Sequence, residues 1–83
     1  MWYVYFILCK DKSLYTGITN DLEKRFREHK NGKGGRYTRS HKVVKILYSE
    51  KLETRSEALK REAEIKKWPR KIKLELIKSG QPK

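Results

Sequence analysis

The sequence predicts a small α+β domain with a three-stranded sheet, in the element order ββαβαα. Residues 2–8 and 14–19 are rich in aromatic and β-branched side chains, and a short polar break of hairpin length separates them. Residues 43–51 alternate weakly in hydrophobicity, as a third strand would. Helix-starting patterns at residues 20–23 and 54–57 precede the segments that we expect to be helical.

The first half of the chain predicts a hairpin followed by a helix. Residues 2–8 are apolar throughout, so this strand is expected to be covered on both faces. Asn20 has the character of an N-cap, and Glu23, three residues later, would complete a capping box. The helix is expected over residues 21–31, and Gly32 is expected to end it. A basic loop follows over 32–42.

The second half predicts a strand and two helices. Val44, Ile46 and Tyr48 carry the alternation of the third strand. The Thr54–Glu57 capping box opens a helix that runs to about residue 68. Pro69 ends that helix and suits the first turn of the next, expected over 69–79 with Ile72, Leu76 and Ile77 facing inward.

The size and composition of the chain exclude several classes of protein. With 83 residues, it is expected to form a single domain over 1–83 with a thin core. The single Cys9 excludes an internal disulfide and a zinc site built from several thiolates. No apolar run approaches the roughly 20 residues of a membrane span, and no signal peptide is recognisable. We therefore expect a cytoplasmic protein, monomeric and without a membrane partner.

The charge of +12 predicts a polyanionic partner, and nucleic acid is the first candidate. It exceeds the roughly 2–8 charges that keep a small domain soluble. The charge is concentrated in residues 23–45, with nine basic and two acidic side chains, and residues 66–83, with seven and one. Within these blocks, the side chains expected to contact nucleic acid are Lys30, Lys33, Arg36, Arg39, Lys42, Lys66, Lys67, Arg70 and Lys71.

Glu62 is the residue that fits least well into an ordinary core. On a helical wheel it falls near the middle of the apolar arc, with Leu59 and Ala63 on one flank and Ala58 and Ile65 on the other. A carboxylate that faces a core must be paired, protonated or bound to a metal ion. The alternatives are a Glu that reaches solvent at a thin edge of the core, or one paired with Arg25 or Lys66.

Further polar residues have spacings that suit a site. Arg25 and His29 are four residues apart and therefore project from one helix face, where Arg can hold a phosphate and His can exchange a proton. The alternative for His29 is a favourable position at the helix C-terminus. Tyr5 and Tyr15 would face the same side if odd residues of the hairpin pair with odd ones. Gly17 inside a strand often marks a close approach.

The ordered set Tyr3-Val4-Tyr5, Tyr15-Thr16-Gly17, Arg25 with His29, and Glu62 resembles the GIY-YIG nuclease superfamily over nearly the whole chain. The stretch SLYTGITNDLEKRFREH is the most specific part, and the chain looks most like the small bacterial proteins of this superfamily, which are largely uncharacterised. The resemblance implies a three-stranded antiparallel sheet flanked by helices. It also implies phosphodiester hydrolysis with one divalent metal ion.

The resemblance also implies a role for each residue. Tyr5 and Tyr15 would line the site, with one of them activating or orienting the attacking water, and Gly17 would let the backbone close up. Arg25 would steady the phosphate or the leaving oxygen, and His29 would assist proton transfer. Glu62 would hold the metal ion, and a lone carboxylate suffices for Mg²⁺, which keeps most of its waters.

Three functions are compatible with these features. The first is a metal-dependent endonuclease that hydrolyses phosphodiester bonds in nucleic acid, DNA rather than RNA. The second is a non-catalytic basic module that binds nucleic acid, with affinity that falls steeply with salt and is indifferent to Glu62 and magnesium. The third is an adaptor whose basic surface docks on an acidic protein.

Overall fold

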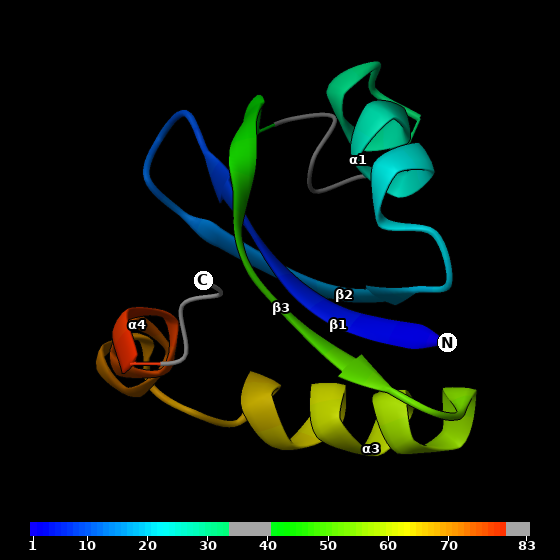
Figure 1. Cartoon of the computed structure of the whole chain (residues 1–83). Coiled ribbons are helices and arrows are strands. Elements are labelled where there is room, and N and C mark those ends of the chain that lie inside the picture. Colours follow the sequence, from blue (N-terminus) through cyan, green and yellow to red (C-terminus); the bar gives the residue numbers. More distant parts are fainter. Residues whose placement is uncertain (34–40, 80–83) are drawn as a thin grey trace.

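The computed structural model describes residues 1–33 and 41–79, and it confirms the predicted α+β class and element order. The strands are β1 (Trp2–Cys9), β2 (Leu14–Thr19) and β3 (Val43–Leu52), and they form one antiparallel sheet in the order β2-β1-β3. The helices of the described part are α1 (Leu22–Lys30), α3 (Arg55–Lys66) and α4 (Arg70–Ser79). In Figure 1, α1 lies on one side of the sheet, and α3 and α4 lie on the other.

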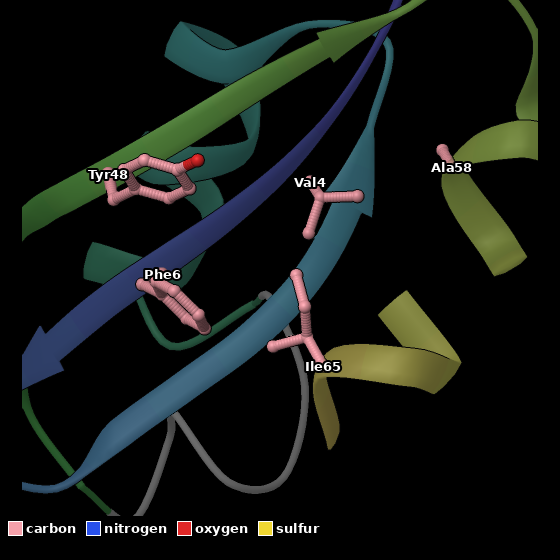
Figure 2. Close-up of a cluster of buried hydrophobic side chains, with 5 residues drawn as sticks. All are labelled: Val4, Phe6, Tyr48, Ala58 and Ile65. Atoms are coloured by element: carbon pink, nitrogen blue, oxygen red, sulfur yellow. The ribbon is translucent and has the colours of Figure 1, made fainter. Parts of the chain in front are cut away.

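Strand β1 is central and carries both halves of the core. Val4 and Phe6 face α3 and form a buried cluster with Tyr48, Ala58 and Ile65 (Figure 2). The alternate side chains of β1 face α1, where Tyr5, Ile7 and Cys9 are buried against Leu22 and Phe26, among others. The expectation of a strand covered on both faces is confirmed.

The β1–β2 ladder is regular, whereas β3 carries irregularities. Tyr5 pairs with Gly17 and Ile7 with Tyr15, so odd residues pair with odd ones, as expected. The β1–β3 register shifts twice: Phe6 pairs with Tyr48 but Ile7 with Ile46, so Leu47 has no partner of its own, and Val44 is skipped in the same way. Each extra residue reverses the faces of the side chains beyond it. The third strand is confirmed, but the predicted alternation through Val44, Ile46 and Tyr48 is interrupted at these two points.

The helix termini follow the expected chemistry, with one correction. The N-cap of α1 is Asp21, which accepts a hydrogen bond from the Lys24 amide, and not Asn20. Asp and Asn cap helices about equally well, so propensity does not discriminate between adjacent candidates. Gly32 takes a positive φ of 76° directly after the C-cap, as expected of a residue that ends a helix. At α3, the Thr54–Glu57 capping box is present with both hydrogen bonds.

The buried apolar faces of α3 and α4 are narrower than the sequence predicts. On α3, Ala58 and Ile65 are fully buried, but Leu59 is 39% exposed and Ala63 is exposed as well. On α4, Leu76 and Ile77 pack against the core, as expected, but Ile72 is 39% exposed. On each helix, therefore, only part of the predicted apolar face packs against the core. No helix in the described ranges has the length and apolarity to cross a membrane.

Candidate active site

The candidate site is centred on the phenol of Tyr5, which the central strand holds 1% exposed. Its hydroxyl lies 2.9 Å from Nε2 of His29, and the His29 side chain is equally buried. The regular hairpin places Gly17 directly opposite Tyr5. A Cβ added at Gly17 would lie only 2.6 Å from the Tyr5 hydroxyl. The phenol thus occupies the space that a side chain at position 17 would take, which is the close approach expected from a strand glycine.

Tyr15 and His29 complete a cluster of rings around this hydroxyl. The ring centroids of Tyr15 and Tyr5 are 6.3 Å apart, and those of Tyr15 and His29 are 5.1 Å apart. Because α1 starts directly after β2, its last turn returns His29 over the hairpin. The hydrogen bond to Tyr5 and the ring contacts hold His29 within the site. The alternative of a helix-terminal His that only meets the helix dipole does not account for these contacts.

Arg25 lies one turn before His29 and carries the positive charge of the site. Its Nη1 donates to Glu28 Oε1 at 3.0 Å, and about a third of its side chain is exposed. The guanidinium also hydrogen-bonds the Tyr5 side chain. Although burial acts against the charged form, these partners raise the pKa of Arg25 above its ordinary value. Arg25 is thus a permanent cation that faces both the buried hydroxyl and solvent.

These contacts set the protonation states of the two central groups. Burial raises the pKa of Tyr5 to about 12, although the Arg25 hydrogen bond acts in the opposite direction. Burial and the nearby Arg25 charge lower the pKa of His29 to about 4. At neutral pH, therefore, Tyr5 keeps its proton and His29 is uncharged. A neutral imidazole can accept the Tyr5 O–H proton at Nε2.

Glu62 approaches the site from α3, which packs against β1 and β2 on the face opposite α1. Its negative charge is one of the influences that raise the pKa of Tyr5, so the two groups lie within electrostatic reach. The Glu62 side chain is 18% exposed, and its Oε2 lies 3.1 Å from Nζ of Lys66. Of the alternatives for this carboxylate, pairing with Lys66 is the one that the structure shows.

The position of α3 depends on Arg61, which the sequence reasoning missed. Arg61 Nε and Nη2 donate to the two carboxylate oxygens of Glu50 on β3 at 2.8 and 2.9 Å. The Tyr48 hydroxyl donates to the same carboxylate at 2.6 Å, and the guanidinium lies over the Trp68 ring at 5.2 Å. This network ties α3 to β3 one residue before Glu62. Only the adjacency of Arg61 to Glu62 could have signalled it.

The donor set for a metal ion is small. No group of three or more His, Cys, Asp or Glu side chains within residues 1–33 and 41–79 could hold one. Glu62 offers one largely covered carboxylate, whereas Glu28 is engaged by Arg25. One carboxylate fits Mg²⁺, which takes one or two protein ligands and completes its shell with water and substrate phosphate. It does not fit Zn²⁺, which requires three or four protein ligands.

The residues expected to contact nucleic acid do not all fall in the described part. Arg36 and Arg39 lie outside it. The other seven residues are exposed and therefore accessible to a partner. Arg70 also donates from Nη2 to the Lys12 carbonyl at 2.6 Å, which ties the start of α4 to the hairpin turn. The exposed residues in question are Lys30, Lys33, Lys42, Lys66, Lys67, Arg70 and Lys71.

A hollow of about 270 Å³ lies beside Arg25 at the end of the hairpin. It is lined by β-strand residues, by the start of α1 and by the Arg25–Glu28 pair, and the sequence reasoning did not anticipate it. Two cationic and two anionic side chains are among its lining residues. The lining residues are Trp2, Ile18, Thr19, Asn20, Asp21, Lys24, Arg25 and Glu28.

Comparison with known proteins identifies similar chains and the family to which they belong. Residues 1–75 match the family model of the GIY-YIG catalytic domain. A UPF0213 protein of Staphylococcus saprophyticus is 51% identical over 78 residues, which cover 94% of this chain and 95% of that protein. A UPF0213 protein of Clostridium perfringens is 54% identical over 79 residues, 95% of this chain and 85% of that one.

Two solved structures are also similar. The solution NMR structure of a UPF0213 protein from Bacillus halodurans has a TM-score of 0.62 at 37% identity, and the match covers 99% of this chain and 89% of that one. The solution NMR structure of a protein from E. faecalis has a TM-score of 0.62 at 45% identity, over 93% and 82% of the two chains.

Proposed function

Because the chain belongs to the GIY-YIG catalytic domain family and to the uncharacterised UPF0213 proteins within it, we propose that it is a divalent-metal-dependent endonuclease. Its substrate is nucleic acid, DNA rather than RNA, and a single domain over 1–83 carries the activity. The observation that carries the proposal is the buried Tyr5–His29 hydrogen bond, with Arg25 beside it.

The Tyr5–His29 pair supplies a path for the proton that the attacking water must lose. The water proton passes to the Tyr5 oxygen as the Tyr5 proton passes to Nε2 of His29, so that the phenol stays neutral and the imidazole becomes charged. The charge of Arg25 contributes to the low pKa of His29. A phosphate bound at Arg25 offsets that charge and raises the pKa, so the imidazole accepts a proton more readily when substrate is present.

Arg25 and Glu62 act on the phosphate from two sides. Arg25 offers a planar guanidinium with donors suited to phosphate oxygens, and these donors can be exchanged from or shared with partners such as Glu28 and Tyr5. Glu62 is the residue that would hold Mg²⁺. When bound, the ion withdraws charge from the phosphate oxygens and makes the phosphorus easier to attack. Domains of this family typically bind a divalent metal, which supports this assignment.

The test is cleavage of branched and single-stranded DNA with Mg²⁺. Glu62→Gln keeps the shape of the side chain but removes its charge, so we expect cleavage to fall by at least about 100-fold, the scale on which loss of a single electrostatic contact acts. Glu75→Gln on α4 is the control, because Glu75 is exposed and its replacement should leave the rate unchanged. Chelation of the metal should also stop cleavage. Cleavage by the Glu62 variant at the wild-type rate would remove Glu62 from the mechanism.

A non-catalytic nucleic-acid-binding module is the second candidate, and the exposure of the seven predicted contact residues in the described part favours it. It predicts binding that weakens steeply with salt, is the same with and without Mg²⁺, and is not followed by cleavage. The endonuclease proposal instead predicts products whose formation depends on both Mg²⁺ and Glu62. Binding without any cleavage of DNA or RNA would decide for the module.

A further inference from the structure

A second pocket lies next to the candidate site, where β2 meets α3 and α4. It has a volume of about 220 Å³ and is lined by Leu14, Tyr15, Thr16, Lys66 and Lys73. Lys66 is in the last turn of α3 and Lys73 is on α4, so each of the two helices contributes a lysine to the lining of this hollow. Two like charges so placed repel each other unless an anion lies between them. A phosphate group held between the two lysines would relieve this repulsion.

Helix α4, which carries Lys73, has a hydrogen bond to the hairpin. The Arg70 guanidinium donates to the Lys12 carbonyl at 2.6 Å and thereby ties the first turn of α4 to the β1–β2 turn. Lys73 follows three residues later, on the same side of the helix, and is half-buried. The pocket is thus bounded by an element fixed to the hairpin that carries Tyr5 and Tyr15.

Tyr15 is common to this pocket and to the candidate site. It lines the pocket, and its ring centroid lies 5.1 Å from that of His29. A nucleic-acid strand carries a phosphate at every nucleotide, about 3.4 Å apart along the axis of a double helix. A strand that runs past Tyr15 from the candidate site to the pocket would carry one phosphate near Arg25 and another near Lys66 and Lys73.

Lys66 connects the pocket to the expected metal ligand. Its Nζ lies 3.1 Å from Glu62 Oε2, while 53% of its own side chain is exposed. Ion pairs of this i,i+4 kind at a surface are weak, so the ammonium can leave the carboxylate at little cost. A metal ion would compete with the Lys66 ammonium for the Glu62 carboxylate. An anion in the pocket would attract the same ammonium away from Glu62.

We propose that the pocket between Tyr15, Lys66 and Lys73 binds the phosphate next to the scissile one, and that Lys66 exchanges between Glu62 and this phosphate. This inference rests on the proposed function for the identity of the strand. Lys66 occupies the Glu62 carboxylate when nucleic acid and metal are absent. It moves to the phosphate when they bind, so the two ligands reinforce each other at this residue.

The test is binding of the thymidine oligonucleotides TpT and TpTpT, which carry one and two phosphates, to the isotope-labelled protein by NMR without metal. The wild type should bind TpTpT several-fold more tightly than TpT, with shifts at Leu14 and Thr16. Lys66→Met and Lys73→Met should lose this preference, because each retains the aliphatic stem but not the charge. The matched controls are Lys60→Met and Lys78→Met, exposed lysines on the same two helices that do not line the pocket.

The exchange of Lys66 is tested in two further titrations. Without metal, Glu62→Gln should increase the preference for TpTpT, because Lys66 is then released to the phosphate. Without nucleic acid, Lys66→Met should bind Mg²⁺ about twofold more tightly than the wild type, the scale on which one such ion pair competes. Lys60→Met should bind Mg²⁺ as the wild type does.

Equal preference for TpTpT in the wild type, Lys66→Met and Lys73→Met would overturn the phosphate site. Unchanged Mg²⁺ affinity in Lys66→Met, or an unchanged oligonucleotide preference in Glu62→Gln, would overturn the exchange. All of these are binding measurements, so they test the phosphate site and the exchange of Lys66 even if the protein cleaves nothing. Absence of cleavage with an intact TpTpT preference would refute the endonuclease and leave the phosphate site standing.

Discussion

Replacing Gly17 by Ala tests the geometry at the centre of the candidate site. The added Cβ would lie 2.6 Å from the Tyr5 hydroxyl oxygen, 2.8 Å from Tyr5 Cζ and 3.0 Å from Cε2 of Tyr15. Ordinary contacts begin at 3.4 Å, so the phenol must shift by about 0.8 Å. Tyr5 is enclosed by the core and by its hydrogen bond to His29, so this shift disturbs both.

The expected losses follow from the size of that shift. Forcing an extra methyl group into a packed core costs about 1–3 kcal/mol of unfolding free energy. A displacement of about 1 Å in a catalytic group can cost about 100-fold in rate, so a loss of that order is expected in kcat for cleavage. Urea unfolding measures the first quantity and cleavage under saturating substrate measures the second. The stability measurement is independent of the proposed activity.

A double-mutant cycle isolates the clash with the hydroxyl. Tyr5→Phe removes the oxygen that lies closest to the new Cβ but leaves Cζ at 2.8 Å, so it should relieve part of the strain. The destabilisation caused by Gly17→Ala should therefore be smaller in the Tyr5→Phe background than in the wild type. Equal destabilisation in the two backgrounds would refute the reasoning, as would a Gly17→Ala variant that keeps wild-type stability and rate.

Three further changes test the protonation state of the site and the contacts that hold α3. The pKa of His29 is about 4, below its ordinary 6.5, so the unfolded chain binds more protons than the folded chain between these pH values. Stability should therefore fall by about 3 kcal/mol as the pH falls through this window, and His29→Gln should remove that dependence. Arg61→Met leaves the carboxylate of Glu50 without its two charged hydrogen bonds and should lower the unfolding free energy by about 2 kcal/mol. Thr54→Ala removes half of the α3 capping box and should cost about 1 kcal/mol.

Each of these predictions has a control measured by the same urea unfolding. For the pH dependence, the control is the wild type above pH 7, where its stability should no longer change with the charge of His29. Lys60→Met is the control for Arg61→Met, and Ser56→Ala is the control for Thr54→Ala, since both side chains are exposed on α3. A stability profile of His29→Gln parallel to that of the wild type between pH 4 and 6.5, or test variants no less stable than their controls, would contradict the account.

The parts of the molecule that could be predicted are those governed by local pattern. The hairpin follows from two β-rich runs around a polar turn, and its parity alone brings Tyr5, Tyr15 and Gly17 to one face. The α3 cap follows from Thr54 and Glu57. The site residues of α1 follow from i,i+4 spacing. These features need no knowledge of which element packs against which.

The parts that could not be predicted depend on tertiary contacts or on a choice between near-equal residues. The extra residue at Leu47 shifts the register of β3 without leaving a Gly or Pro signal. The exposure of Leu59 depends on where α3 meets the sheet, which its composition does not specify. The Arg61–Glu50 contact joins residues eleven apart through the fold. Asp21 replaces Asn20 as N-cap because both side chains can accept the same hydrogen bond.

The uneven regularity of the sheet determines where the chain can tolerate a change in length. Strand β3 already carries two skipped residues, at Leu47 and Val44, and the register of β1 with β2, which places Tyr5 opposite Gly17, is nevertheless regular. Gaining or losing one residue at these points would alter only β3, the edge strand that lies on the other side of β1 from β2 and Gly17. The same change in β2 would turn Tyr15 and Gly17 to the other face together. Insertions and deletions among homologues should therefore accumulate in β3 and spare β2.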